Sequence, residues 1–306
     1  MTLMAVPAAE VVIDDALVRS LIADQHPDLA SLALGERTEG WDNVTYRLGS
    51  SLAVRLPRRE LAAPLADNEI EWLPRVSAHW TFPAPVPQRV GKPSGDYPWR
   101  WSIVPWISGA LAFTKPLSVE GAQDLGWALA QIHTPAPADA PRNPFRSVPL
   151  SERAETFGAR LHRIEPQLED GGARLREAFA AGAQTAPGPV TWTHLDLHGG
   201  NILTQGGRLA GILDWGDAGV GSPATDLGQA SVAVGREHVA PLLDAYAGAA
   251  TDSAARFIAS AAGRLQVRSE AVNFAVTLAN IDDAQYSEPG LRALRSFDQR
   301  RTHPLG

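Results

Sequence analysis

The segment HLDLHGGN, residues 194–201, places histidine or aspartate at every second position and then adds two glycines and an asparagine. On an extended strand, side chains two positions apart share a face, so His194, Asp196 and His198 could converge on a cation such as zinc. On a loop, Asp196 could instead act as a general base, with Asn201 as an oxygen ligand of magnesium. The segment alone therefore allows a zinc-dependent hydrolase or a phosphoryl-transfer loop.

A second acidic segment, GILDWGD, places Asp214 at the end of an apolar run, 13 positions after Asn201. Gly207 lies between them and predicts a hairpin turn. Oxygen ligands from Asn201 and Asp214 suit magnesium, whereas a pair of histidines suits zinc. A zinc site would leave Asn201, Asp214 and Asp226 without a role, so the pattern favours phosphoryl transfer.

Composition narrows the classes of partner. The 306 residues are 44% hydrophobic and 20% charged, which is typical of a globular protein. A net charge of −7 argues against nucleic-acid binding, because phosphate backbones require concentrated lysine and arginine. Zero cysteines exclude thiolate zinc ligands and cysteine nucleophiles in this sequence. A weakly acidic protein suits a neutral or cationic partner.

The hydropathy pattern predicts a cytoplasmic protein with no membrane partner. No lysine or arginine precedes Arg19, and Asp14 and Asp15 follow a short apolar stretch, unlike the start of a secretory signal. No segment approaches the roughly 20 apolar residues that span a bilayer.

The first 106 residues predict a small lobe of mixed strands and helices, and residues 107–306 predict a larger, mainly helical lobe. Helical spacing, strand alternation and turn residues define the segments. The small lobe is expected to contain a helix over about 14–25, a hairpin of strands 43–49 and 51–56, a helix over about 62–78 and extended segments at 86–90 and 101–107. In the large lobe, Ser118 is expected to cap a helix, with further helices within 151–182 and 223–300 and short strands on either side of the 194–201 segment.

These motifs together resemble the aminoglycoside phosphotransferase family. HLDLHGGNIL followed by GILDWGDAGVGSPATDLG is similar to the family pattern H-G-D-x-H-x-x-N-h-L, then h-D-[FW] and a later D-h-[AG], where h is apolar. The likeness is densest in residues 190–230. It implies a two-lobed, protein-kinase-like α+β fold, and magnesium-dependent transfer of the γ-phosphoryl group of ATP or GTP to a hydroxyl of a small molecule.

The resemblance also implies roles for single residues. Asp196 would be the catalytic base, Asn201 and Asp214 would bind Mg²⁺, and His194 and Asp226 would support the loop. His198 is a loop-supporting or substrate-proximal candidate. The family glycine after the first histidine is Leu195 here, a departure that bears on the loop backbone and removes no reactive group.

On the nucleotide side, the resemblance requires a strand cation for the α- and β-phosphates, paired with a glutamate on the next helix. No lysine precedes Lys92, so the cation must be an arginine, and Arg55 stands at the matching place with Glu69 as the matching acid. Arginine keeps its charge and offers a planar fork of donors. Arg58 and Arg59 are close enough in sequence to compete for this role.

The resemblance places two further nucleotide contacts on this side of the protein. A nucleotide-facing turn is expected near residues 39–43. The hinge that contacts the adenine is expected near Val104 to Trp106.

The acceptor side contains an acidic region. Four acids and no lysine or arginine occur between residues 270 and 289, namely Glu270, Asp282, Asp283 and Glu288. One interpretation is a solvated helical face. The other is an acidic wall for a cationic acceptor, because the resemblance places acceptor recognition among the C-terminal helices, and it makes Glu270, Asp282 and Asp283 substrate candidates.

The acceptor itself stays open at this point. The family's best-known acceptors are antibiotics, with aminoglycosides expected first and macrolides or basic peptide antibiotics next. Similar enzymes phosphorylate metabolites such as homoserine, choline or sugars, and likeness of fold does not choose among them. A catalytically silent nucleotide-binding module would need a broken triad, whereas Asp196, Asn201 and Asp214 are all present.

Overall fold

The computed structural model describes residues 7–95 and 97–298, which form two compact units. We call the first the sheet unit; it contains the described residues up to Gly109 together with Ala210–Ala218. We call the second the helical unit; it contains residues 110–209 and the described residues from Gly219 onward. The segment that carries Asp214 therefore belongs to the sheet unit, although it lies late in the sequence.

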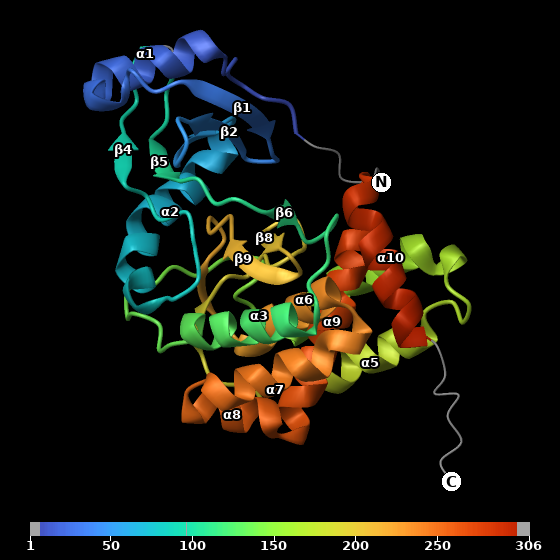
Figure 1. Cartoon of the computed structure of the whole chain (residues 1–306). Coiled ribbons are helices and arrows are strands. Elements are labelled where there is room, and N and C mark those ends of the chain that lie inside the picture. Colours follow the sequence, from blue (N-terminus) through green and yellow to red (C-terminus); the bar gives the residue numbers. More distant parts are fainter. Residues whose placement is uncertain (1–6, 96, 299–306) are drawn as a thin grey trace. The chain divides into compact units, whose positions relative to one another are not determined.

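The sheet unit is built on a five-stranded antiparallel sheet with the strand order β1-β2-β3-β5-β4. Figure 1 shows its helices α1 and α2 in blue and cyan. Its elements are α1 (Asp15–Gln25), β1 (Leu34–Glu39), β2 (Asn43–Leu48), β3 (Leu52–Pro57), α2 (Ala63–Val76), β4 (Arg89–Gly91) and β5 (Trp101–Pro105).

Local sequence signals set the start of α1 and the turn of the first hairpin, as expected. Asp14 caps α1, because its carboxylate accepts a hydrogen bond from the Leu17 amide at 2.9 Å. Between β2 and β3, Gly49 adopts a φ of 61°, a conformation that favours glycine. The hairpin then pairs Leu48 with Leu52.

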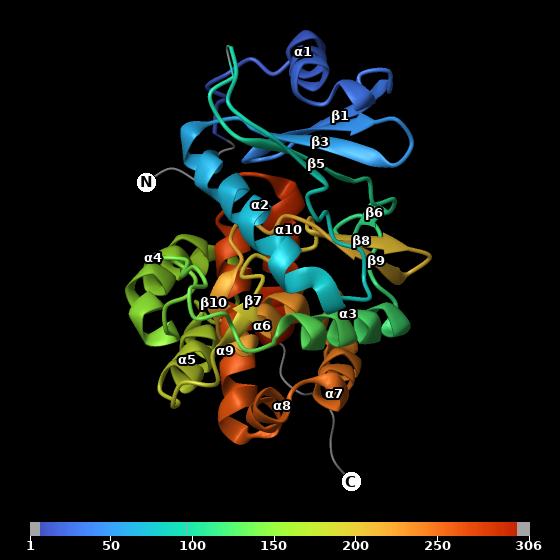
Figure 2. The ribbon, with the colours of Figure 1, turned by 90° about the vertical axis from the view of Figure 1, so that its left-hand side faces the viewer.

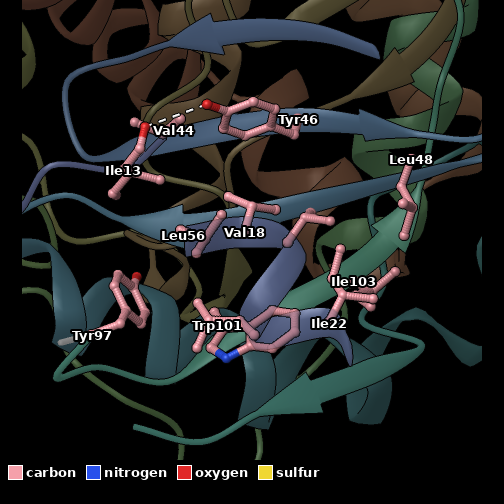
Figure 3. Close-up of a cluster of buried hydrophobic side chains, with 12 residues drawn as sticks. Ile13, Val18, Ile22, Val44, Tyr46, Leu48, Leu56, Tyr97, Trp101 and Ile103 are labelled. Carbon is pink, nitrogen blue, oxygen red and sulfur yellow. Dashed lines mark hydrogen bonds between the residues drawn. The ribbon is translucent and has the colours of Figure 1, made fainter. Parts of the chain in front are cut away.

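The core of the sheet unit lies between α1 and one face of the sheet (Figure 3). Val54 and Leu56 of β3 point into this core, and the Tyr46 hydroxyl donates to the carbonyl of Ile13 at 3.3 Å. Because side chains alternate along a strand, Arg55 lies on the opposite face. Strand alternation therefore directs Arg55 away from the α1 core.

The helical unit contains eight helices and short strands among its described residues. Strand β10 pairs with β7, and β6, β8 and β9 form a three-stranded sheet in that order. Strand β9 continues into the segment that belongs to the sheet unit. The elements are β6 (Ala110–Leu111), α3 (Val119–Ile132), α4 (Ala154–Ile164), α5 (Ala173–Ala183), β7 (Thr191–Thr193), β8 (Ile202–Gln205), β9 (Arg208–Ile212), β10 (Gly219–Gly221), α6 (Pro223–Val234), α7 (Val239–Ala249), α8 (Asp252–Ala259), α9 (Ala261–Ala279) and α10 (Ala284–Asp298).

Helix α9 is central to the packing of the helical unit. Figure 2 shows α9 beside α4, α5 and α6, and buried side chains of α4, α5, α9 and α10 form one apolar core. Among the described residues, no helix is both long enough and apolar enough to cross a bilayer.

The hairpin after the 194–201 segment is fixed by close packing. Gly206 and Gly207 both have positive φ, and Gly207 approaches α3 so closely that a Cβ on Gly121 would lie 2.1 Å from its carbonyl oxygen. Ser118 caps α3, as expected, by accepting from the Gly121 amide at 3.2 Å, and its own amide donates to Gly207. The turn predicted at Gly207 is confirmed.

Candidate active site

The loop between β7 and β8 carries the first group of candidate residues, in the helical unit. Leu195 adopts a φ of 69°, which explains why a glycine would suit this position. Its side chain is fully buried, and its carbonyl accepts from Gln229 at 2.9 Å and from Arg146 at 2.8 Å. The backbone is therefore held in this conformation by side chains from two other elements.

Asp226, near the start of α6, lies under this loop. Its carboxylate accepts from the amides of His194 at 2.7 Å and Leu195 at 2.8 Å, and it contacts His133 Nε2 at 3.1 Å. Burial alone would raise the pKa of Asp226, but the hydrogen bonds from His133 and from the His194 amide hold it below its usual range. An ionised, buried Asp226 therefore fixes the loop backbone on either side of His194.

The contact network continues beyond His133. Its Nδ1 lies 2.9 Å from the Tyr246 hydroxyl, and burial raises the pKa of Tyr246, so this hydroxyl keeps its proton and can donate to the imidazole. That donor leaves His133 Nε2 as the donor to Asp226, which orders the chain Tyr246, His133, Asp226 and then the loop.

Asp196 is two residues further along the same loop. Its carboxylate forms an ion pair with Arg146, and its second oxygen lies 3.9 Å from His198 Nε2. Burial alone would raise the pKa of Asp196, but Arg146 and then His198 hold it below its usual value. The carboxylate is thus ionised at neutral pH, as a general base must be.

The two loop histidines use one ring nitrogen each to hold the backbone. His194 Nδ1 accepts from the Asp196 amide at 3.2 Å, and His198 Nδ1 accepts from the Gly200 amide at 3.0 Å. A nitrogen that accepts such a bond has no lone pair left for a metal, so in each ring only Nε2 could bind one. In the described ranges, no group of three or more His, Asp or Glu side chains is arranged to hold a metal ion. This geometry gives the zinc hydrolase no support.

Asn201 closes the loop. Its side-chain nitrogen donates to the Asp196 carbonyl at 2.9 Å, which directs the amide oxygen elsewhere and leaves it available to a cation. Asn201 is 6% exposed. A buried amide oxygen of this kind is a ligand that suits Mg²⁺.

Two aromatic rings pack against His198. Phe113 stacks on its ring at 5.6 Å between centroids, and Tyr286 of α10 lies edge-on at 5.2 Å. A Cβ on Gly199 would lie 2.5 Å from Phe113, so this packing requires the glycine. Sequence reasoning missed Phe113, Tyr286 and Arg146, because none of them lies in a recognisable motif.

The second group of candidate residues lies in the sheet unit. Arg55 contacts Glu69 of α2 at 3.3 Å and Asp214 at 3.4 Å. Burial alone would lower the pKa of Arg55, but Glu69 and Asp214 raise it above its usual value. Glu69 also accepts from the Trp215 amide at 2.9 Å. One arginine and one glutamate therefore hold the segment around Asp214.

Of the three arginines that compete in sequence, Arg55 contacts Glu69. Arg58 donates to the Gly40 carbonyl at 2.8 Å and pairs with Glu39, and Arg59 pairs with Asp42. Strand β3 ends at Pro57, so the last two arginines leave the sheet and approach the turn at residues 39–43.

The Asp214 backbone is held in a conformation that few residues adopt. Its φ is 58°, and the next ring, Trp215, stacks on Trp80 at 4.6 Å. Asn68 of α2 donates to the carbonyls of Gly216 and Ala218, each at 2.8 Å. The Asp214 carboxylate stays 45% exposed and accessible to a cation.

The two expected adenine contacts lie at the end of β5. Val104 is buried and pairs with Ala53, and the Trp106 amide donates to the Ser51 carbonyl at 2.8 Å. The Arg47 guanidinium lies 5.3 Å above the Trp106 ring. The structure thus places both residues beside β3, the strand of Arg55.

The proposed acidic wall needs one correction. Glu270 is 4% exposed and pairs through both oxygens with Arg153, at 2.6 and 3.0 Å, and it also accepts from the Thr225 hydroxyl at 2.9 Å. A buried carboxylate with these partners cannot line a surface that binds an acceptor. Asp282 is exposed, and Asp283 accepts from the Gln285 amide at the start of α10.

The sequence matches one known protein family over most of its length. The profile of the phosphotransferase enzyme family matches residues 34–260. A viomycin phosphotransferase of Streptomyces vinaceus is 32% identical over 104 residues. That match spans 32% of this chain and 33% of the relative, or about a third of each.

Solved structures extend the likeness to the whole fold. The GDP complex of aminoglycoside 2'-phosphotransferase-IIIa has a TM-score of 0.63 at 16% identity and covers 94% of this chain and 99% of its own. A macrolide 2'-phosphotransferase from Brachybacterium faecium has a TM-score of 0.57 at 21% identity and covers 93% and 99%. The fold is therefore kinase-like, with an N-terminal antiparallel sheet followed by a mainly helical region, as expected.

Proposed function

Because this chain belongs to the phosphotransferase enzyme family and is a small-molecule kinase, we propose that it transfers the γ-phosphoryl group of ATP or GTP to a hydroxyl of an antibiotic. The observation that carries the proposal is the state of Asp196. It is ionised, paired with Arg146 and mounted on a loop that Asp226 fixes. An ionised carboxylate held in place in this way can accept the proton of an alcohol acceptor.

In the proposed reaction, Asp196 accepts the proton of the acceptor hydroxyl while the oxygen of that hydroxyl attacks the γ-phosphorus. The bond to the β-phosphate oxygen breaks, and ADP or GDP leaves. Arg55 would contact the α- and β-phosphates, with Glu69 holding its side chain in place. Val104 and Trp106 would contact the adenine.

The chemistry of two residues, one in each unit, suits a magnesium ion. The Asn201 amide oxygen and the Asp214 carboxylate are both hard oxygen ligands. When bound, Mg²⁺ would neutralise the negative charge of the β- and γ-phosphates.

The names of the matched relatives favour antibiotics as acceptors. The matched proteins are named as phosphotransferases of viomycin, of aminoglycosides and of macrolides. We place aminoglycosides, macrolides and basic peptide antibiotics first among acceptors, and Asp282, Asp283 and His198 as candidates for contact with them. The alternative is a metabolite kinase that acts on an alcohol such as homoserine, choline or a sugar.

A coupled assay of nucleotide consumption tests this function. ATP and GTP are supplied separately with Mg²⁺, against a panel of those antibiotics and small hydroxyl metabolites. We expect ADP or GDP release that depends on one class of acceptor and disappears in Asp196→Asn. Absence of release with every acceptor, together with tightly bound zinc in the purified protein, would contradict the proposal.

Replacing Arg55 should weaken nucleotide binding more than it affects the phosphoryl-transfer step. Arg55→Met removes hydrogen bonds between charged groups, so we expect the Kd for ATP or GTP to rise about 10- to 100-fold. Arg55→Lys keeps the charge without the planar fork, so its Kd should lie between those of wild type and Arg55→Met. Arg89→Met, an exposed arginine on β4 of the same sheet, is the matched control. Equal Kd values for all four proteins would remove Arg55 from the nucleotide site.

Replacing Asp214 should remove the part of nucleotide binding that depends on metal. Asp214→Asn is the informative variant, because asparagine tolerates the φ of 58° that alanine would not. We expect chelation of Mg²⁺ to weaken nucleotide binding by wild type, and to have little further effect on Asp214→Asn. The measurement is a nucleotide titration by calorimetry with and without EDTA, and an unchanged EDTA effect in the variant would count against this role.

A further inference from the structure

Arg160 of α4 is a half-buried arginine on the helical unit. One guanidinium nitrogen donates to the Thr277 hydroxyl of α9 at 2.9 Å, and α4 lies beside α9 in Figure 2. No aspartate or glutamate of residues 7–95 or 97–298 lies within ion-pair distance of it. A guanidinium has five donor hydrogens, so most of the hydrogen-bonding capacity of Arg160 is not met by Thr277.

Two further arginines stand close to Arg160. Its pKa is lowered first by burial and then by the positive charges of Arg146 and Arg163. Arg163 lies one turn further along α4 and donates to Asn280 at 3.5 Å, while Asn280 donates back to the Arg160 carbonyl at 3.1 Å. The α9 partner of the Arg160 guanidinium is thus a neutral hydroxyl group, which does not balance its charge.

Arg146 connects this cluster to the catalytic loop. It lies in the turn of residues 143–147, where the Asn143 side chain accepts from the amides of Phe145 and Arg146 at 2.9 and 3.0 Å. From that turn its guanidinium reaches both Asp196 and the Leu195 carbonyl. The cluster of like charges therefore begins beside the candidate base.

We propose that Arg160, flanked by Arg146 and Arg163, forms an oxyanion-binding site beside the catalytic loop. A carboxylate or phosphate would accept the unused guanidinium hydrogens of Arg160 and would balance its charge. In the proposed reaction, such a group comes from one of two sources: a carboxylate on the acceptor, or the phosphate ester that transfer creates. This inference rests on the proposed function for the identity of the source and not for the existence of the site.

The first test measures anion binding without catalysis. The full chain is heated in increasing sodium sulfate or inorganic phosphate at constant ionic strength, without nucleotide, and the Tm is recorded. We expect sulfate and phosphate to raise the Tm of wild type, and Arg160→Gln to raise the apparent Kd for both by at least about tenfold. Arg268→Gln, an exposed arginine on α9, is the matched control and should behave as wild type.

Stability without anion separates this role from a purely structural one. Arg160→Gln gives up one hydrogen bond to a hydroxyl and removes a charge that two neighbours repel, so its anion-free Tm should be equal to or above that of wild type. A structural arginine would give a lower Tm instead. No anion effect in wild type, or the same effect in Arg160→Gln and Arg268→Gln, would overturn the proposal even if phosphoryl transfer is established.

Two kinetic arms then distinguish the sources. If the acceptor supplies the anion, Arg160→Gln should raise KM for a carboxylate-bearing acceptor and leave KM for its amide unchanged. If the product supplies it, the variant should raise the inhibition constant of the phosphorylated acceptor and leave KM unchanged. No change in either constant would overturn a role in the reaction.

Discussion

Asp196→Asn should lower kcat by about 10²- to 10⁴-fold, the range that a positioned general base contributes. The amide keeps the shape of the carboxylate but cannot accept the proton of the acceptor hydroxyl. The backbone contacts of Asp196, from its amide to His194 and from Asn201 to its carbonyl, should survive. The measurement is single-turnover transfer to the acceptor that the assay identifies.

The control for this prediction is nucleotide affinity. Since Arg55 and Glu69 belong to the sheet unit, the Kd for ATP or GTP should stay near the wild-type value in Asp196→Asn. A large loss of nucleotide binding would mean that the substitution disturbs the loop, and wild-type turnover would remove Asp196 from the role of base.

The elements that local chemistry dictates were predictable from sequence. Asp14 and Ser118 cap their helices, and Gly207 turns its hairpin, because each position needs a particular side chain or backbone conformation. The kinase-like fold was likewise expected from the resemblance and is confirmed by the comparisons. The strand cation was assigned to Arg55, with Arg58 and Arg59 as competitors, because the choice depends on where strand β3 ends.

The surroundings of Asp196 were not predictable, because they come from distant segments. Arg146 precedes its partner by 50 positions and stands in no motif, and Tyr286 reaches His198 from α10. Glu270 was a candidate for an acidic wall because nearby residues are acidic. It is buried by the close packing of α6 on α9, where a Cβ on Gly228 would lie 2.5 Å from the Glu270 Cβ. Charge patterns reveal composition, whereas burial depends on tertiary packing.

Asp226→Asn should destabilise the protein by about 1–3 kcal/mol, the usual cost of leaving a buried hydrogen-bond donor unsatisfied. Its carboxylate accepts from two loop amides and from His133, all of which are donors. An asparagine presents one oxygen and one NH₂ group, so a donor would face a donor at one of these contacts. Urea unfolding followed by tryptophan fluorescence measures the loss. Asp124→Asn, which breaks an exposed pair with Arg208, should cost at most about 1 kcal/mol.

The pH dependence of the stability difference between wild type and Asp226→Asn supplies a second check on the role of Asp226. The pKa of Asp226 in the folded state lies below the usual value, because the hydrogen bonds from His133 and from the His194 amide outweigh burial. The carboxylate therefore contributes stability that is fully present above the unfolded pKa of roughly 3.9 and is lost as the pH falls through the folded pKa. The gap between wild type and Asp226→Asn should be constant near neutral pH and should narrow below about pH 4. A gap that stays constant into acid would mean that the charge of Asp226 does not hold the loop, and that shape alone does.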